Sequence, residues 1–150
     1  MKVRDVMHTP VLTLNYDTTY EGAALFFIEK NIKGCPVLNE AGDIVGMLSD
    51  KDLYKVLYPY YHSFYESPEM YTDLEKREDK IDEIRNNPIE RFMVRDIVFV
   101  GPEDKIMKVG GVMLARGIHR MPVVEDGKLV GIVTRGDIYK TIIKNHLKKK

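Results

Sequence analysis

Two short segments of this sequence carry a hydroxyl residue followed three positions later by an aspartate. They run from Ser49 to Asp52 and from Thr134 to Asp137, and each begins three residues after a glycine. An ionised carboxylate has two acceptor oxygens, which suits the two adjacent hydroxyl groups of a ribose. If a helix begins at the hydroxyl residue, its free N–H groups also favour a nearby phosphate. Both segments are therefore candidate sites for a ligand that carries ribose and phosphate.

The same pattern has a purely structural interpretation. In a capping box the hydroxyl accepts a backbone N–H at the start of a helix, and an acidic residue three positions later accepts another. Capping boxes prefer Glu or Gln at that third position, whereas both segments here use aspartate. The spacing leaves both interpretations open, and the recurrence of the pattern adds weight to ligand binding.

The recurrence is part of a longer internal repeat, which indicates the elements that position these residues. Residues 3–57 align with residues 89–142 with a single gap. A match of this length predicts two copies of one structural unit. The matched positions include Met7 with Met93, Cys35-Pro36-Val37 with Met121-Pro122-Val123, Gly46 with Gly131, and Asp52 with Asp137.

Each copy is expected to contain a strand, a helix, two further strands and a final helix. Runs of β-favourable residues predict the strands, and the turns between them contain Gly, Asn or Asp. Acidic and hydroxyl residues at 17–18 and 103–104 are expected to cap the first helix of each copy. The predicted strands are 11–14, 36–38 and 44–48 in the first copy and 97–100, 121–124 and 129–133 in the second. The first predicted helix of each copy lies near 18–31 and 104–116, and the final helices begin near Ser49 and Thr134.

A copy of about 55 residues buries little surface by itself. We therefore expect an α+β fold in which two β-α-β-β-α motifs, related by a pseudo-two-fold axis, pack through their sheets. Two equivalent clefts at such an interface would suit small ligands. The expected organisation is a first motif at 1–57, an insert or linker at 58–88, a second motif at 89–143 and a basic tail at 144–150.

This ordered set of motifs resembles a tandem CBS-domain pair, named after cystathionine β-synthase and also called a Bateman module. The resemblance covers residues 1–57 and 89–142, including Gly-x-x-Ser/Thr-x-x-Asp at 46–52 and 131–137, and leaves 58–88 unexplained. It implies a stand-alone regulatory module that performs no catalysis. The implied ligands are the adenine nucleotides AMP, ADP and ATP, with S-adenosylmethionine or methylthioadenosine as the alternative.

The resemblance also assigns candidate site residues, because the motif aspartate of the family holds the ribose. An arginine stands at 135 where the first copy has Asp50, and like charge near a phosphate is unfavourable. The second copy is therefore predicted to hold the preferred site, although His119 and Arg120 could instead be a solvated loop pair. The preferred site comprises Asp137, Thr134, Arg135, His119, Arg120, Ile118, Ile97 and Arg95, and the weaker site comprises Asp52, Ser49, Lys33, Ile32, Val11 and Thr9.

Composition argues against several other functions. The formal net charge is zero, so nucleic acid is not an expected partner. No stretch approaches the roughly 20 apolar residues of a membrane span, and the sequence starts without a signal-peptide pattern. A single cysteine rules out an internal disulfide, which fits a cytoplasmic location.

Residues suited to catalysis or metal binding do not form a set. Cys35 matches Met121 of the other copy and precedes a strand, so we expect a small buried residue there. The four histidines, His8, His62, His119 and His146, show no metal-ligand spacing. No phosphate-binding Gly-x-x-x-x-Gly-Lys loop is present. We therefore expect no enzyme activity, no catalytic residue and no metal site.

The remaining features concern association with other proteins. The predicted helices near 18–31 and 104–116 are apolar nearly all round, so a second apolar face is left for a partner. Because CBS modules commonly pair through such helices, the resemblance implies a homodimer through them, and we expect a separate, unidentified regulated protein. Five of the nine tyrosines fall in 58–88, and they form either a small satellite core or a partner surface. A dimeric scaffold without ligand is the competing function.

Overall fold

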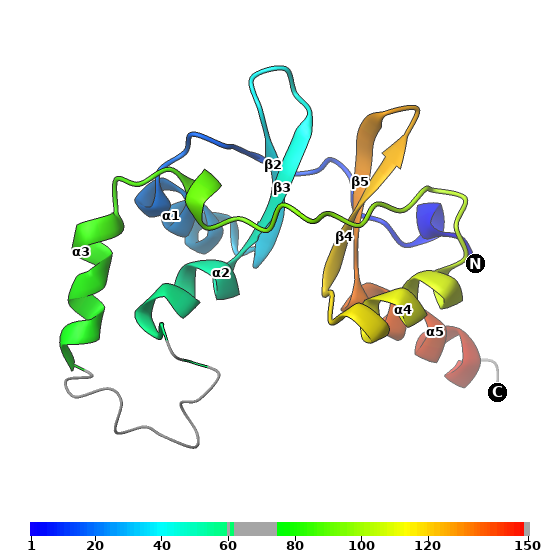
Figure 1. Cartoon of the computed structure of the whole chain (residues 1–150). Coiled ribbons are helices and arrows are strands. Elements are labelled where there is room, and N and C mark those ends of the chain that lie inside the picture. Colours follow the sequence, from blue (N-terminus) through cyan, green and yellow to red (C-terminus); the bar gives the residue numbers. More distant parts are fainter. Residues whose placement is uncertain (60, 62–74, 149–150) are drawn as a thin grey trace. The chain divides into compact units, whose positions relative to one another are not determined.

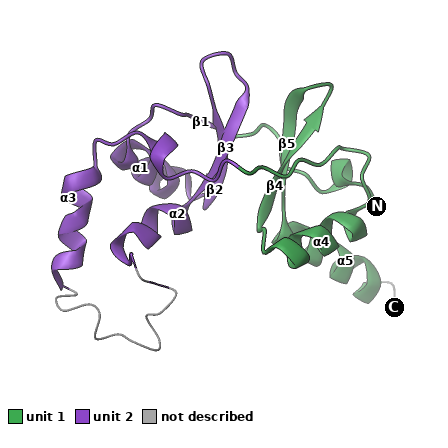
Figure 2. Ribbon diagram, viewed as in Figure 1, with its two compact units in different colours: residues 1–12, 96–150 green, residues 13–95 purple. Residues whose placement is uncertain are grey.

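The computed structural model describes residues 1–59, 61 and 75–148. The chain divides into two compact units, which Figure 2 shows in different colours. Unit 1 contains residues 1–12 and 96–150, and unit 2 contains residues 13–95. Tyr60, Tyr65 and Tyr71 of the tyrosine-rich insert lie outside the described residues, so the two interpretations of these tyrosines stay predictions.

Unit 2 is built on a three-stranded sheet with helices packed against it (Figure 1). Strand β2 is the central strand, parallel to β1 and antiparallel to β3. The strands are β1 (Leu14–Asn15), β2 (Gly34–Leu38) and β3 (Ile44–Ser49), and the α-helices are α1 (Tyr20–Lys30), α2 (Asp50–Tyr54) and α3 (Lys80–Ile84). Short 3-10 helices cover Lys55–Leu57, Glu75–Asp79 and Ile89–Arg91.

Unit 1 repeats the antiparallel hairpin and its two helices. Strands β4 (Arg120–Glu125) and β5 (Lys128–Thr134) form the sheet, α4 (Ile106–Arg116) precedes it and α5 (Arg135–Leu147) follows it, with a 3-10 helix at Val3–Asp5. Both predicted hairpins are confirmed. The β4–β5 turn places Asp126 and Gly127 at φ of 52° and 75°, the positive values that a two-residue hairpin turn requires.

The first segment of each repeat belongs to the unit that contains the other repeat. Val3 and Ile89 occupy matching positions, and both are fully buried. Val3 lies in the apolar core of unit 1 with residues of α4, β4 and β5, whereas Ile89 lies in the core of unit 2 with residues of α1, β2 and β3. The compact units are therefore not contiguous repeats, because residues 1–12 and 89–95 are exchanged between them.

A methionine and a glycine fix this exchange in each unit. A Cβ atom added to Gly131 would lie 2.6 Å from the sulfur of Met7, and one added to Gly46 would lie 2.5 Å from the sulfur of Met93. Only a glycine allows such a close approach of a side chain to the strand. The glycine and methionine signatures found in the sequence are thus contact partners across the repeats.

The first helix of each repeat begins later than expected, so the predicted caps are wrong. Helix α1 is capped by Thr19, whose hydroxyl accepts the Gly22 N–H at 3.0 Å. Helix α4 follows Lys105, and Asp104 is engaged before the helix starts. Its carboxylate accepts the Gly101 N–H and its carbonyl accepts the Val3 N–H, which holds the chain in a turn.

The predicted first strands are also shorter than expected. Strand β1 covers two residues, and the matched run 97–100 is reduced to one parallel bridge between Val100 and Val123. In unit 2 the Tyr16 N–H continues the pairing by donating to Leu38. Pro102 occupies the matching position in unit 1 and has no N–H to donate. The missing donor explains why the pairing stops there.

The described part of the insert packs on unit 2. The Arg77 guanidinium donates to the carbonyl oxygens of Leu57 and Val56, and Ile84 of α3 joins the apolar core. The expected basic tail begins inside α5, which continues to Leu147. In the described part of the chain, no helix is both long and apolar enough to cross a membrane.

Candidate functional site

The carboxylate of Asp137 lies at the start of α5 in unit 1. Its Oδ2 atom accepts a hydrogen bond from the Thr134 hydroxyl and lies 2.7 Å from Nε2 of His8. The Thr134 hydroxyl in turn accepts the Asp137 N–H at 3.2 Å, so Thr134 is the N-cap of the helix. The Asp137 side chain remains 25% exposed. The result is a carboxylate fixed at a helix N-terminus and still open to solvent.

Backbone pairing brings His119 and Arg120 of the second copy to the start of this helix. Strand β4 pairs Arg120 with Thr134 at the end of β5, and the Arg135 N–H donates to the carbonyl oxygen of His119 at 2.9 Å. The His119 side chain is exposed and Arg120 is half-buried. The backbone of His119 and Arg120 therefore lies beside the first turn of α5, where a phosphate would be favoured.

Asp52 occupies the matching position in unit 2, but neighbouring groups enclose its carboxylate. Its Oδ2 accepts both the Ser49 N–H at 2.9 Å and the Ser49 hydroxyl at 3.0 Å, and the Asp52 N–H donates to that hydroxyl. Its Oδ1 lies 3.5 Å from Nζ of Lys55, and the side chain is only 9% exposed. These contacts are those of the capping box. The structural interpretation therefore accounts fully for Asp52.

Lys33 occupies the place that His119 has in the other unit. Its carbonyl oxygen accepts the Asp50 N–H at 2.8 Å, as that of His119 accepts the Arg135 N–H. The exposed residue at the start of α2 is thus Asp50, whereas α5 starts with Arg135. The predicted difference in charge between the two helix starts is present in the folded structure.

The remaining predicted site residues divide differently between the units. Thr9 and Val11, grouped by sequence with Asp52, are in unit 1, and Arg95, grouped with Asp137, is in unit 2. Arg95 pairs with Glu90. Ile97 belongs to unit 1, as does Ile118, which packs on its apolar core, while Ile32 packs on the core of unit 2.

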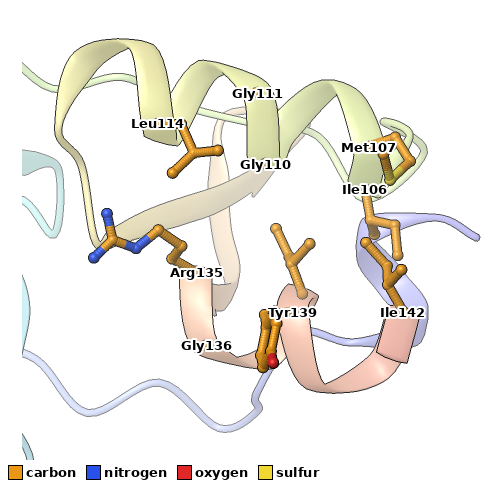
Figure 3. A pocket seen from close by; sticks show the side chains of 10 residues that line it. Ile106, Met107, Gly110, Gly111, Leu114, Arg135, Gly136, Tyr139 and Ile142 are labelled. Atoms are coloured by element: carbon orange, nitrogen blue, oxygen red, sulfur yellow. The ribbon is translucent and has the colours of Figure 1, made fainter. Parts of the chain in front are cut away.

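Helices α4 and α5 of unit 1 border an apolar hollow of about 580 Å³ (Figure 3). Gly110 and Gly111 of α4 leave room on one side, and Tyr139 of α5 lies on the other. Arg135 is the charged residue of its lining, and Figure 3 shows its side chain at the end near Leu114. The other residues that line it are Ile106, Met107, Gly136, Ile138 and Ile142.

Sequence reasoning missed two residues at the aspartates. His8 contacts Asp137 across 129 positions of sequence, and Lys55 contacts Asp52. Lys55 could have been found from the sequence, because it lies about one helical turn after Asp52 and can therefore reach its carboxylate. His8 directly precedes Thr9, which was itself a candidate, but only the exchange of leading segments brings it to the second motif. The repeat has Val94 at the position that matches His8.

Other reactive groups offer little alternative chemistry. Cys35 is buried in the core of unit 2, as expected from its position. Among the described residues, no group of three or more His, Cys, Asp and Glu side chains is arranged to hold a metal ion.

Comparison with known proteins gives a consistent result. The family model described as CBS domain matches residues 3–59 and 89–144. The uncharacterized protein MJ1426 of Methanocaldococcus jannaschii is 30% identical over 155 residues, which cover 95% of this chain and 92% of that protein. MJ1225 of the same organism is 29% identical, and the match covers 93% of this chain but only 42% of that protein.

Solved structures with the same fold include ligand complexes. The CBS domain of a CBS domain-containing membrane protein from Sphaerobacter thermophilus is 31% identical, with a TM-score of 0.71 over 93% of this chain and 86% of that one. The domain pair of protein MJ0100, solved with 5′-methylthioadenosine and S-adenosyl-L-methionine, is 23% identical with a TM-score of 0.72 over 97% and 98%. CBSX2 of Arabidopsis thaliana, solved with AMP, is 23% identical with a TM-score of 0.71 over 97% and 98%.

Proposed function

Because this chain belongs to the CBS domain family, we propose that it is a regulatory module that binds an adenosine-containing ligand at Asp137. The observation that carries the proposal is the partial exposure of this carboxylate. Asp137 is 25% exposed at the start of α5, whereas Asp52 is 9% exposed and closed by Ser49 and Lys55. A ribose diol needs accessible carboxylate oxygens, so unit 1 offers the better site.

The helix behind Asp137 favours the phosphate of a nucleotide. Helix α5 has 13 residues and α2 has five, so α5 presents the stronger positive end of a helix dipole. Arg135 begins α5, while Asp50 begins α2 and would repel a phosphate. AMP, ADP and ATP are therefore the preferred ligand class for the Asp137 site.

Two fold relatives support an adenosine ligand without choosing its type. One was solved with AMP and the other with methylthioadenosine and S-adenosylmethionine. The shared part of these molecules is the adenosine with its ribose. A sulfonium ligand would tolerate Asp50 at the unit 2 site better than a phosphate would, so the two ligand types are separate arms of the test.

The test is isothermal titration calorimetry with AMP, ADP, ATP, S-adenosylmethionine and methylthioadenosine. We expect at least one of these ligands to bind wild type and Asp52→Asn. Asp137→Asn should weaken binding by about 10- to 100-fold, because a hydrogen bond to a charged acceptor contributes about 1.5–3 kcal/mol. Melting temperature without ligand serves as the folding control for both variants.

Other outcomes change the proposal in defined ways. Loss of binding in Asp52→Asn alone would transfer the site to unit 2. If no adenosine ligand binds wild type, both motifs are helix caps and the ligand proposal is wrong. A sulfonium ligand that binds when AMP, ADP and ATP do not would identify the S-adenosylmethionine class.

Exposed apolar side chains support a homodimer, with a scaffold as the second candidate function. Ile28 of α1 is 76% exposed and Leu114 of α4 is 70% exposed, the latter beside the hollow in Figure 3. Burial of such residues against a second copy removes apolar surface from water. Light scattering should give twice the 17.3 kDa chain mass for wild type. Leu114→Lys should shift it toward monomer, and a monomeric wild type at tens of micromolar would contradict the dimer.

A further inference from the structure

The ring of His8 occupies an acceptor that a ribose would need. Its Nε2 lies 2.7 Å from Oδ2 of Asp137, and the same oxygen accepts the Thr134 hydroxyl. A carboxylate oxygen has about two lone-pair positions. Oδ2 is therefore saturated by these two contacts, and a diol that approaches Asp137 finds only Oδ1.

The backbone, not the ring contact alone, delivers His8 to this place. The His8 N–H donates to the Ile132 carbonyl at 2.8 Å, and the Ile132 N–H donates to the His8 carbonyl at 3.1 Å. Met7 packs against Gly131 immediately beside this bridge. The segment is thus paired with β5, while the His8 side chain is exposed and free to leave the carboxylate by rotation.

Helix α5 and strand β5 supply polar groups beside His8. Helix α5 contributes the Asp137 carboxylate, and β5 contributes the Ile132 backbone and the Thr134 hydroxyl that ends it. Charged residues on the His8 segment itself are paired elsewhere. Lys2 and Arg4 contact Glu103, and the Asp5 carboxylate accepts the Lys2 N–H.

We propose that His8 controls access to the Asp137 site. In the absence of ligand its ring covers one carboxylate oxygen of Asp137, and the ring must move away for a ribose diol to bind both oxygens. The proposal rests on the proposed function. Unit 2 lacks this control because Val94 stands at the matching position, where its backbone pairs with Met47 in the same way.

The experiment measures adenosine affinity by calorimetry at one neutral pH for wild type and His8 variants. Adenosine carries no phosphate, so the measurement reports on the ribose and adenine contacts alone. His8→Val, which copies the residue of unit 2, should bind about tenfold more tightly than wild type, the effect of removing one competing hydrogen bond from the carboxylate.

Two further variants separate this role from a structural one. His8→Gln keeps a hydrogen-bond donor at this position and should bind adenosine about as tightly as wild type. His146→Gln removes an exposed histidine elsewhere on the chain, in α5, and should leave adenosine affinity unchanged. Melting temperatures of the unliganded variants show that each is folded.

Several results would overturn the proposal. Equal adenosine affinity of wild type and His8→Val would remove the role of His8 and leave the ligand site intact. If His8→Val weakens the binding of AMP but not that of adenosine, His8 is a phosphate contact instead. If neither adenosine nor AMP binds any variant, the proposed function itself fails.

Discussion

Asp52 and Asp137 occupy the same point of two copies of one fold, yet their surroundings differ. In unit 2 the carboxylate is held by Ser49 on one oxygen and by Lys55 on the other, and it is buried. In unit 1 one oxygen meets Thr134 and His8, and the side chain is partly exposed. The repeated backbone supplies the helix cap at both positions, while a few neighbouring side chains set how exposed each carboxylate is.

The largest predicted effect concerns the exchanged segments. Val3→Asp places an unpaired charge in the core of unit 1, and Ile89→Asp does the same in unit 2, each with a loss on the order of 4 kcal/mol. Hydrogen exchange should show lost protection within 96–148 for Val3→Asp and within 13–57 for Ile89→Asp. Val3→Ile serves as the conservative control. The opposite assignment of lost protection would mean that each repeat forms its own unit.

The next effect concerns the contact between methionine and glycine. Gly131→Ala and Gly46→Ala should each lower the free energy of unfolding by about 1–3 kcal/mol, because the added Cβ overlaps a methionine sulfur. Met7→Ala should relieve the first and Met93→Ala the second, as measured by double-mutant cycles in urea. Coupling of Gly131 with Met93 rather than with Met7 would contradict the exchanged arrangement.

A smaller effect is expected from a polar contact found in unit 2. The Tyr20 hydroxyl donates to the Leu53 carbonyl at 2.6 Å and joins α1 to α2, whereas unit 1 has buried Ile106 at the matching position. Tyr20→Phe should lower the free energy of unfolding by about 1 kcal/mol. Urea titrations at pH 7 measure this loss, and Ile106→Val in unit 1 provides a comparison without a hydrogen bond.

The same tyrosine predicts a pH dependence. Burial raises the pKa of Tyr20 in the folded protein, because the ionised phenol is poorly solvated there. Its contribution is therefore fully present below the ordinary tyrosine pKa of about 10 and is lost as the pH rises through the higher folded value. The stability difference between wild type and Tyr20→Phe should shrink above pH 10. A difference that stays constant to pH 11 would contradict the shift.

The smallest effect is expected at Lys55. This side chain is 39% exposed, so its pairing with Asp52 is screened by solvent, and Lys55→Ala should change the free energy of unfolding by less than about 0.5 kcal/mol. Lys140→Ala at the matching position of unit 1 is the control. Adenosine binding should be unchanged, since Ser49 still closes Asp52. A second binding site in Lys55→Ala would show that Lys55 alone blocks unit 2.

Local patterns predicted the parts of the fold that depend on neighbouring residues. The two hairpins, the helices α1 and α4, and the helix starts at Ser49 and Thr134 follow from turn residues, apolar periodicity and cap spacing. The first strand of the second copy was not predictable from alignment alone, because Pro102 removes a donor that Tyr16 provides.

The candidate site was predictable only in part, for a different reason. A repeat shows which residues match, but it does not show on which copy a leading segment packs. His8 carries no signal in its own surroundings, and its role depends on a partner 129 positions away. The motif aspartates were found from spacing, whereas the neighbours that distinguish them required the folded chain.

The exchange of leading segments also affects the order in which the two units can fold while the chain is being synthesised on the ribosome. Residues 1–12 are synthesised before their partners on β5 and α5, which follow about 120–130 positions later in the chain. At translation rates of roughly 5–20 residues per second, this interval is about 6–26 s. Unit 2 is complete once residue 95 has emerged. Of the two units, the one that contains the proposed ligand site is therefore the later to form, although residues 1–12 of that unit are made before unit 2.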